Sequence, residues 1–84
     1  SHFKLAIIYA ILNDKQKSLH YLEMIKNSRS VPLYFINDLK TNPMFDNVRG
    51  DLEFQKIFSE LEKKYFDEHE KIKKLLISRG LEPA

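Results

Sequence analysis

Apolar residues recur along this chain at intervals of three and four, the spacing that places side chains on one face of an α-helix. The alternation of apolar and polar residues that is typical of a β-strand is absent. We therefore expect an all-α fold of five helices. The expected elements are helices over residues 3–12 and 16–27, a third helix from residue 32, a single turn after residue 43, and a long helix over residues 52–78.

Two prolines mark the starts of helices in this pattern. Asn42-Pro43 combines an N-capping side chain with a proline at the first helical position, where its missing N–H costs nothing. Pro32 is expected in the same position of the third helix, with Ser30 or Val31 as its N-cap. The helices on either side of residue 30 should therefore be separate elements.

The last predicted helix begins after Asp51, which is expected to cap it, and it stops at Gly80. Its apolar stripe changes character midway, because the polar run Asp67 to Lys71 interrupts it. The stripe comprises Phe54, Ile57, Phe58, Leu61 and Tyr65, and it resumes with Ile72, Leu75 and Leu76. We expect the first half of this helix to pack on the domain and the second half to project from it.

The first predicted helix is apolar on every side, so we expect it to be covered on more than one face. Asn13-Asp14 supplies a tight turn to the second helix, since both residue types tolerate turn geometry. Ser18 is a small residue on the side of the second helix that faces the first, and it should allow a close approach there.

Composition narrows the classes of protein to consider. The chain has 84 residues, of which 43% are apolar and 31% charged, as in a small globular domain. Its net charge of +2 is too small to indicate a nucleic-acid or membrane partner. The longest apolar run, residues 5–12, is far shorter than the roughly 20 residues of a membrane span. The lack of cysteine fits a reducing compartment, and we expect a cytoplasmic location.

The titratable residues do not form a recognisable catalytic or metal-binding pattern. The three histidines, His2, His20 and His69, lack the paired spacing of metal ligands. The run Asp67 to Glu70 occupies consecutive helical positions, whose side chains point in different directions. From Glu60 to Arg79, six basic residues are balanced by five acidic ones, which favours a solvated face over a phosphate-binding one. We therefore expect no enzyme, no metal site and no cofactor.

The first two helices carry a spacing that is known from a helical repeat. It comprises the pair Leu5-Ala6, then Tyr9, and then Ser18, Leu22 and Ile25. This spacing resembles that of the tetratricopeptide repeat, in which a helical hairpin stacks on its neighbours. Ile25 departs from the alanine that the family has there, and Pro32 comes later than the family's proline. The resemblance implies that the chain is a fragment of an α-solenoid.

A second resemblance covers the middle of the chain. Residues 39–55 read L-K-T-N-P-M-F-D-N-V-R-G-D-L-E-F-Q. The segment resembles the tail that closes many bacterial tetratricopeptide arrays, attached to nucleotide cyclases, kinases and transcriptional regulators. Asn42 replaces an aspartate of that tail, Val48 a leucine and Leu52 a proline. The resemblance implies that this segment caps the apolar end of a solenoid.

These patterns divide the chain into three parts. Residues 1–28 are expected to form the last repeat-like hairpin, truncated at its N-terminus; residues 29–61 form capping helices; and residues 62–84 form a helical C-terminal extension. The chain is therefore expected to be the end of a longer protein, because a single hairpin of this kind cannot bury its apolar faces alone. The resemblance of residues 39–55 implies that this protein is bacterial.

Two functions are consistent with this organisation. The first is a non-catalytic protein–protein interaction module, the terminal repeat and cap of an array. In such arrays the first helix of each repeat lines the inner groove, which implies partner contacts at Phe3, Ile7, Ala10 and Ile11, although packing on a preceding repeat accounts for these residues slightly better. The alternative is a regulatory domain that drives homodimerisation of its parent through the long helix, with contacts at Phe66, Ile72, Leu75 and Leu76. In either case we expect protein partners, and a homo-oligomer of the isolated chain.

Overall fold

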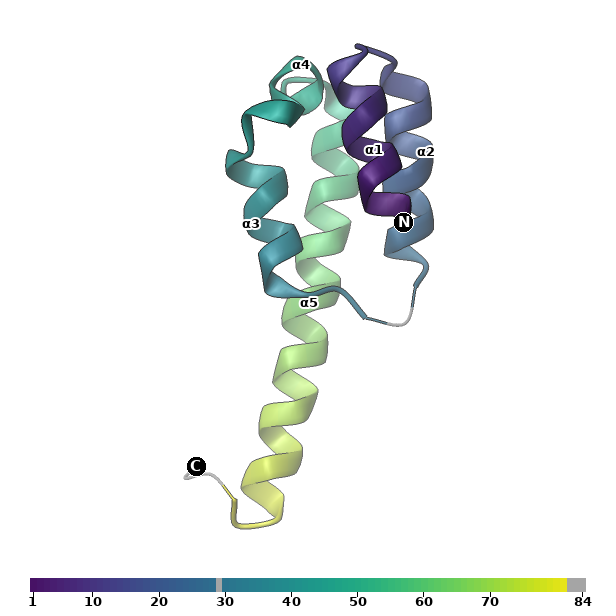
Figure 1. The fold of residues 1–84 in the computed structure, drawn as a ribbon. Coiled ribbons are helices and arrows are strands. Elements are labelled where there is room, and N and C mark those ends of the chain that lie inside the picture. The colour runs from purple at the N-terminus through teal and green to yellow at the C-terminus, as the bar shows by residue number, and fades with distance from the viewer. Residues whose placement is uncertain (29, 82–84) are drawn as a thin grey trace.

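The computed structural model describes residues 1–28 and 30–81, and over these residues the chain is helical without any β-strand (Figure 1). The elements are α1 (His2–Ile11), α2 (Lys15–Lys26), α3 (Leu33–Thr41), the 3-10 turn η1 (Pro43–Phe45), α4 (Asp46–Arg49) and α5 (Leu52–Ser78). The predicted all-α class is confirmed. The boundary expected at residue 29 and the last three residues of the expected extension lie outside the described residues.

The helices form a bundle with one long protrusion. Helices α1 and α2 make an antiparallel hairpin, α3 lies on the other side of α1, and the first half of α5 runs behind them (Figure 1). Helix α1 packs mainly on α2, and also on η1 and α4, while α5 packs on both α2 and α3. Helix α5 therefore connects the hairpin to the rest of the chain.

A single apolar core lies between these elements. Phe45 and Phe54 are buried with their ring centres 6.1 Å apart, whereas Phe58 of the predicted α5 stripe is only half-buried. The core consists of Ala6, Ala10, Leu19, Leu22, Val31, Phe35, Ile36, Leu39, Phe45, Val48, Phe54 and Leu61. Every helix from α1 to α5 contributes to it, so no single part of the chain holds a core of its own.

The α1–α2 hairpin is closed by a tight turn and a close helix contact. Asn13 adopts the left-handed conformation with φ of 56°, which asparagine tolerates better than most residues. The Asp14 carboxylate accepts a hydrogen bond from the amide of Lys17 at 3.2 Å and so caps α2. Ser18 is fully buried where α2 meets α1, which confirms the close approach expected from its small size.

The predicted caps of the later helices are confirmed. The Asn42 side chain accepts from the amide of Met44 at 3.0 Å, with Pro43 at the first helical position. The Asp51 carboxylate accepts from the amides of Glu53, at 2.9 Å, and Phe54, at 3.2 Å. Both caps satisfy amide groups that the first helical turn leaves without a partner.

Gly80 ends α5 as expected. Its φ of +71° reverses the chain without the steric penalty of a side chain. The Gly80 amide donates to the carbonyl of Ile77 at 3.0 Å, and the Leu81 amide donates to that of Leu76 at 2.9 Å. This pair of bonds is the Schellman arrangement, which gives α5 a defined C-terminus.

The start of the third helix was predicted one residue too early. Helix α3 begins at Leu33, and Pro32 takes the N-cap position, with an extended ψ of 154° and no side-chain hydrogen bond. Neither Ser30 nor Val31 caps it. Val31 is instead buried in the core, and its amide donates to the Glu68 carboxylate of α5 at 3.4 Å. Packing against α5 therefore decides this boundary, where the local sequence signal was ambiguous.

Helix α5 extends well past the bundle. Its 27 residues span about 40 Å, and the molecule measures 49 × 20 × 18 Å. Leu61 is its last fully buried residue, and Tyr65 is the last one that packs against the core. The second half projects away from the other helices, as its interrupted stripe predicts (Figure 1).

Candidate protein-interaction surfaces

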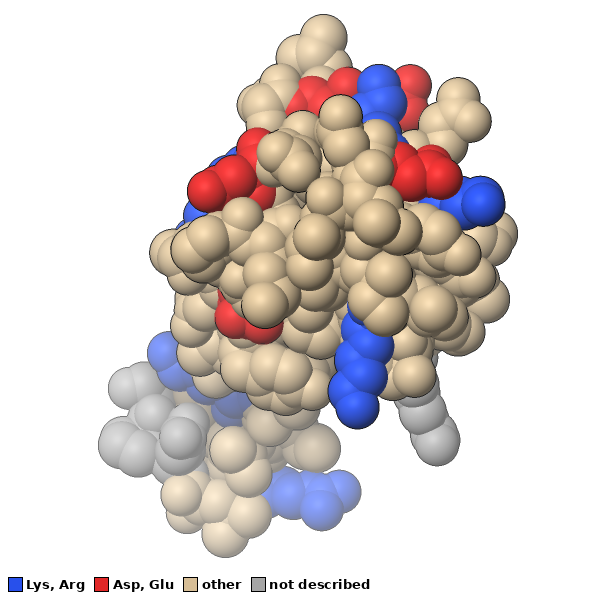
Figure 2. Space-filling model, turned by 45° about the horizontal axis from the view of Figure 1, so that its top comes forward, with Lys and Arg blue, Asp and Glu red and all other residues tan. Residues whose placement is uncertain are grey.

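The outer side of α1 is an apolar surface that no element within residues 1–28 and 30–81 covers. Ile8, Ile11 and Leu12 are exposed by 49%, 52% and 66%, and we call these three residues the outer α1 surface. They lie opposite the fully buried Ala6 and Ala10. Figure 2 shows a face of the molecule that is mostly uncharged, with acidic and basic side chains around its edge and a few within it.

The opposite side of α1 belongs to the core of the chain itself. The ring of Phe3 meets that of Phe35 edge-on at 4.6 Å and stacks on that of Phe45 at 6.0 Å. Ile7 is half-buried against the same core, and Ala10 has no exposed surface. Of the four residues implied by the repeat resemblance, Ile11 is thus the most open to a partner.

The sequence analysis did not single out Ile8 and Leu12, which are the rest of the outer α1 surface. A signal for them was present, because α1 has alanines at positions 6 and 10, four residues apart. Small residues at that spacing mark the side where another helix comes close, so the large apolar residues opposite them face outward. In this chain α3 and η1 fold against Phe3, so the chain itself covers that edge of α1.

The second apolar surface lies on the projecting part of α5. Ile72 and Leu75 are exposed by 57% and 49%, Leu76 is half-buried, and we call these three the C-terminal stripe. The 100° turn per residue places Ile72 in line with the buried Phe54 and Leu61, so the stripe continues the face that packs inside the bundle. Phe66 is 56% exposed but lies about 120° around the helix from Ile72, outside the stripe.

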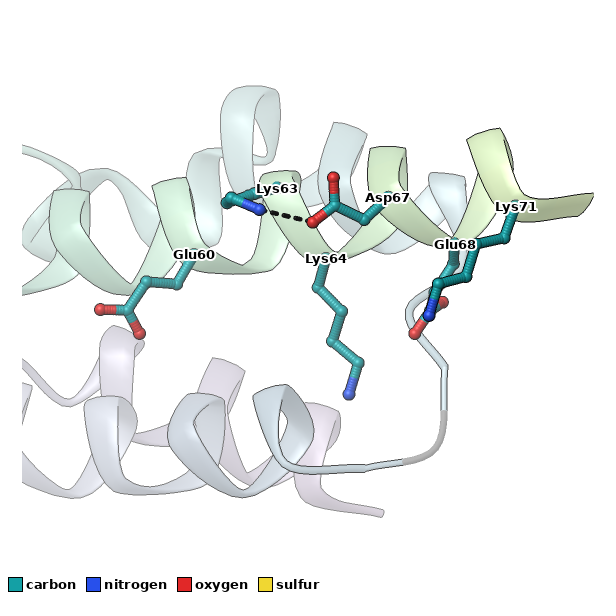
Figure 3. A pocket seen from close by; sticks show the side chains of 6 residues that line it. All are labelled: Glu60, Lys63, Lys64, Asp67, Glu68 and Lys71. Carbon is teal, nitrogen blue, oxygen red and sulfur yellow. Dashed lines mark hydrogen bonds and ion pairs between the residues drawn. The ribbon is translucent and has the colours of Figure 1, made fainter. Parts of the chain in front are cut away.

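Charged residues of α5 line a surface hollow of about 360 Å³ near the base of the bundle (Figure 3). The lining residues are Glu60, Lys63, Lys64, Asp67, Glu68 and Lys71. Lys63 and Asp67 pair along the helix at 2.5 Å, and the Glu68 carboxylate accepts from the amide of Val31. The carboxylates of Asp67 and Glu68 thus point in different directions, and each binds a group of the protein itself.

Lys64 joins α5 to the end of α2. Its ammonium group donates to the carbonyl of Lys26, the last residue of α2, at 2.8 Å, and also to the carbonyl of Ser28. A cation is favourable at this position because the last carbonyls of a helix carry partial negative charge. The sequence analysis counted Lys64 among solvated charges, since only the tertiary fold brings α2 to it.

Two ion-pair clusters lie between the hairpin and α5. The Lys15 ammonium meets the Asp51 carboxylate at 2.8 Å, and this hydrogen bond lowers the pKa of Asp51 and raises that of Lys15. The Lys26 ammonium pairs with Glu23 at 2.5 Å and with Glu60. Hydrogen bonds to Glu23 and then Glu60 raise the pKa of Lys26, and the bond from Lys26 lowers the pKa of Glu60. All these residues are half-buried and remain in contact with water, which screens each pair, so each contributes little to stability.

The three histidines lie beside tyrosines. His20 meets Tyr21 edge-on at 5.2 Å, His2 lies 6.1 Å from the same ring, and His69 stacks on Tyr65 at 6.0 Å. Within residues 1–28 and 30–81, no group of three or more His, Asp or Glu side chains is arranged to hold a metal ion. Across the same residues, no helix combines the length and apolar character needed to cross a membrane.

Comparison with known proteins assigns no family to this chain, so its function is interpreted from its residues. The chain matches no protein-family model, no curated protein and no solved structure.

Proposed function

We propose that this chain is a non-catalytic protein–protein interaction module, the terminal repeat and cap of a tetratricopeptide-like array in a larger bacterial protein. The observation that supports this proposal is the outer α1 surface. Exposed apolar residues scattered singly are normal on a protein surface, whereas three on one face of one helix favour burial by another protein surface.

The energetic argument is one of area. Fully burying an isoleucine or leucine side chain is worth about 1.5–3 kcal/mol. Because Ile8, Ile11 and Leu12 are already partly covered, a partner gains roughly half of that from each of them. The hairpin spacing and the cap-like segment at residues 39–55 add to the proposal, since the parts they resemble extend and close an array. A preceding repeat is then the natural occupant of the surface.

Site-specific photo-crosslinking tests this function. A photoreactive residue at Ile11 should form covalent adducts with another polypeptide segment when the protein is expressed in bacterial cells. The same residue at Gln16, which is exposed on α2, is the matched control and should form far fewer. Equal adduct yields from both positions would contradict the proposal, because they would show collision without preference for the outer α1 surface.

A second candidate function is homodimerisation through the projecting part of α5. The observation that favours it is the C-terminal stripe, which continues the buried face of α5 beyond the last core contact at Tyr65. A chain that ends at residue 69 keeps the Glu68–Val31 bond and should keep the bundle. The shortened chain should keep a helical circular dichroism spectrum and a melting temperature close to that of the full chain. Its self-association at high concentration should disappear. Unfolding of the shortened chain would show that the extension is core, which would end its role as an interface.

A further inference from the structure

The projecting part of α5 carries a seam with a specific order of charges. Residues seven apart on a helix recur on nearly the same face. Inside the bundle this face is apolar, with Phe54, Phe58, Leu61 and Tyr65 turned toward the chain's own core. Beyond the bundle the same two rows continue as Glu68, Ile72, Leu75 and Arg79. The free seam thus consists of two apolar residues between an acidic and a basic one.

We propose that a second copy of this chain covers the free seam, with its α5 antiparallel to the first. This inference rests on the second candidate function above. In the pair, Ile72 packs against the partner's Leu75, and Leu75 against the partner's Ile72. The twofold axis that creates these two apolar layers also places Glu68 opposite the partner's Arg79, and Arg79 opposite the partner's Glu68. Each apolar layer is therefore flanked by a pair of opposite charges.

Charge decides between the two possible directions. In a parallel pair each residue meets its own copy, which would bring Glu68 against Glu68 and Arg79 against Arg79 at seam positions. Like charges at seam positions disfavour the parallel pair, whereas the opposite charges at these positions favour the antiparallel pair. Lys73 and Lys74 lie outside the seam, so they stay in water in the antiparallel pair.

The shape of the molecule agrees with this choice. The free seam lies on the same face of α5 that the bundle covers nearer its N-terminus (Figure 1). In a parallel pair the N-terminal half of the partner's α5 would therefore clash with the bundle. In an antiparallel pair the partner's bundle lies at the far end of the seam, below the first molecule. Only the C-terminal end of the partner's α5 then reaches the base of the bundle at Glu68. The Schellman turn at Gly80 stops the partner's helix at that level. Residues 69–78 supply about 15 Å of helix for the contact.

The two charged residues are available for the pairing. Glu68 is half-buried and holds the Val31 amide through one oxygen at a long 3.4 Å, so its second oxygen is available to a guanidinium. Arg79 is exposed and forms no ion pair with any residue of the described ranges 1–28 and 30–81. A guanidinium reaches a carboxylate over several ångströms of flexible stem.

Charge exchange in the full 84-residue chain tests the pairing. By sedimentation over ~10 µM to ~1 mM, the range suited to a small interface, we expect a reversible dimer. Glu68→Arg and Arg79→Glu should each weaken it about tenfold, because each creates two like-charge contacts. The double variant should restore the affinity of the natural chain. Circular dichroism of each variant establishes that the monomer remains folded.

The outcomes separate this inference from the function on which it rests. A natural chain that stays monomeric at ~1 mM overturns both the dimerisation function and the seam. A dimer that the double variant fails to restore keeps dimerisation but overturns the antiparallel seam.

A distance measurement checks the direction independently. The chain has no cysteine, so Ser59→Cys, at an exposed position of α5, carries a single spin label. In the antiparallel pair the two labels lie about 45 Å apart along the helix axes, from the rise of 1.5 Å per residue. In a parallel pair they lie at the same height, with no separation along the helix axes, so only the widths of the two molecules, each at most 20 Å across the long axis, separate them. The shorter distance would overturn the inference.

Discussion

The hydroxyl of Ser18 donates a hydrogen bond to the main-chain carbonyl of Ala6 at 2.8 Å, at the point where α2 crosses α1. Both residues are fully buried. A small side chain is required here because the two helix backbones come close, and a buried hydroxyl is tolerated only where it finds a partner. The contact holds together the hairpin that presents the outer α1 surface.

Substitutions at Ser18 should separate the hydrogen bond from the packing. Ser18→Ala keeps the small size and should lower the free energy of unfolding by about 1 kcal/mol. Ser18→Leu forces extra volume between the helices and should lower it by about 2–3 kcal/mol. Urea titration followed by circular dichroism measures both. If Leu is tolerated better than Ala, the helices are not in close contact at this site.

Phe54→Ala should be among the most destabilising substitutions in the chain. The side chain is 2% exposed and packs beside Phe45 in the middle of the core, so its removal leaves a cavity worth about 3–5 kcal/mol. Leu52→Ala is the matched control on the same helix, because Leu52 is 81% exposed and should matter little. Thermal unfolding compares the two. Similar melting temperatures for both variants would contradict the packing of α5 on η1.

Lys64 and Lys63 are neighbours in sequence with different roles. Lys64→Met removes two hydrogen bonds to the end of α2 and should cost about 1 kcal/mol, after allowance for partial exposure. Lys63→Met removes only a pair with Asp67 on the same helix and should cost about 0.3 kcal/mol. Chemical denaturation of both variants tests the difference. Equal losses would show that Lys64 does not hold α2 in solution.

The ion pair between Asp51 and Lys15 should make stability depend on pH at both extremes. The bond from Lys15 lowers the pKa of Asp51 from 3.8, so its contribution is present above pH 3.8 and disappears as pH falls through the lowered value. The same bond raises the pKa of Lys15 from 10.5, so that contribution is present below pH 10.5 and disappears as pH rises through the raised value.

Asp51→Asn tests this dependence with the N-cap preserved, because asparagine caps helices as well as aspartate does. The melting temperature of the natural chain should fall below pH 3.8 more steeply than that of the variant. If the melting temperatures of the natural chain and the variant fall equally steeply at acid pH, Asp51 and Lys15 do not pair in solution.

Local signals in the sequence were enough for most of the secondary structure. Asn42 and Asp51 cap helices through bonds to amides two or three residues away, and Gly80 ends α5 through its own backbone angle. Such signals depend only on residues that are close in sequence, so they can be recognised without knowledge of the fold. Pro32 was misplaced by one residue because the buried Val31 and its contact with Glu68, far along the chain, decide where α3 begins.

Identifying the candidate surfaces required both the sequence pattern and the tertiary structure. The periodicity of α5 identified Ile72, Leu75 and Leu76 as an apolar stripe beyond the core, because a helix repeats its faces whatever surrounds it. In the sequence, only the alanines at positions 6 and 10 mark which side of α1 is packed, since apolar residues occupy all of its sides. The tertiary structure decided it by folding α3 and η1 against Phe3, which buries one apolar side of α1 and leaves Ile8, Ile11 and Leu12 in water. The physical reason is that periodicity sets which residues share a face, whereas only packing between distant segments sets which face is covered.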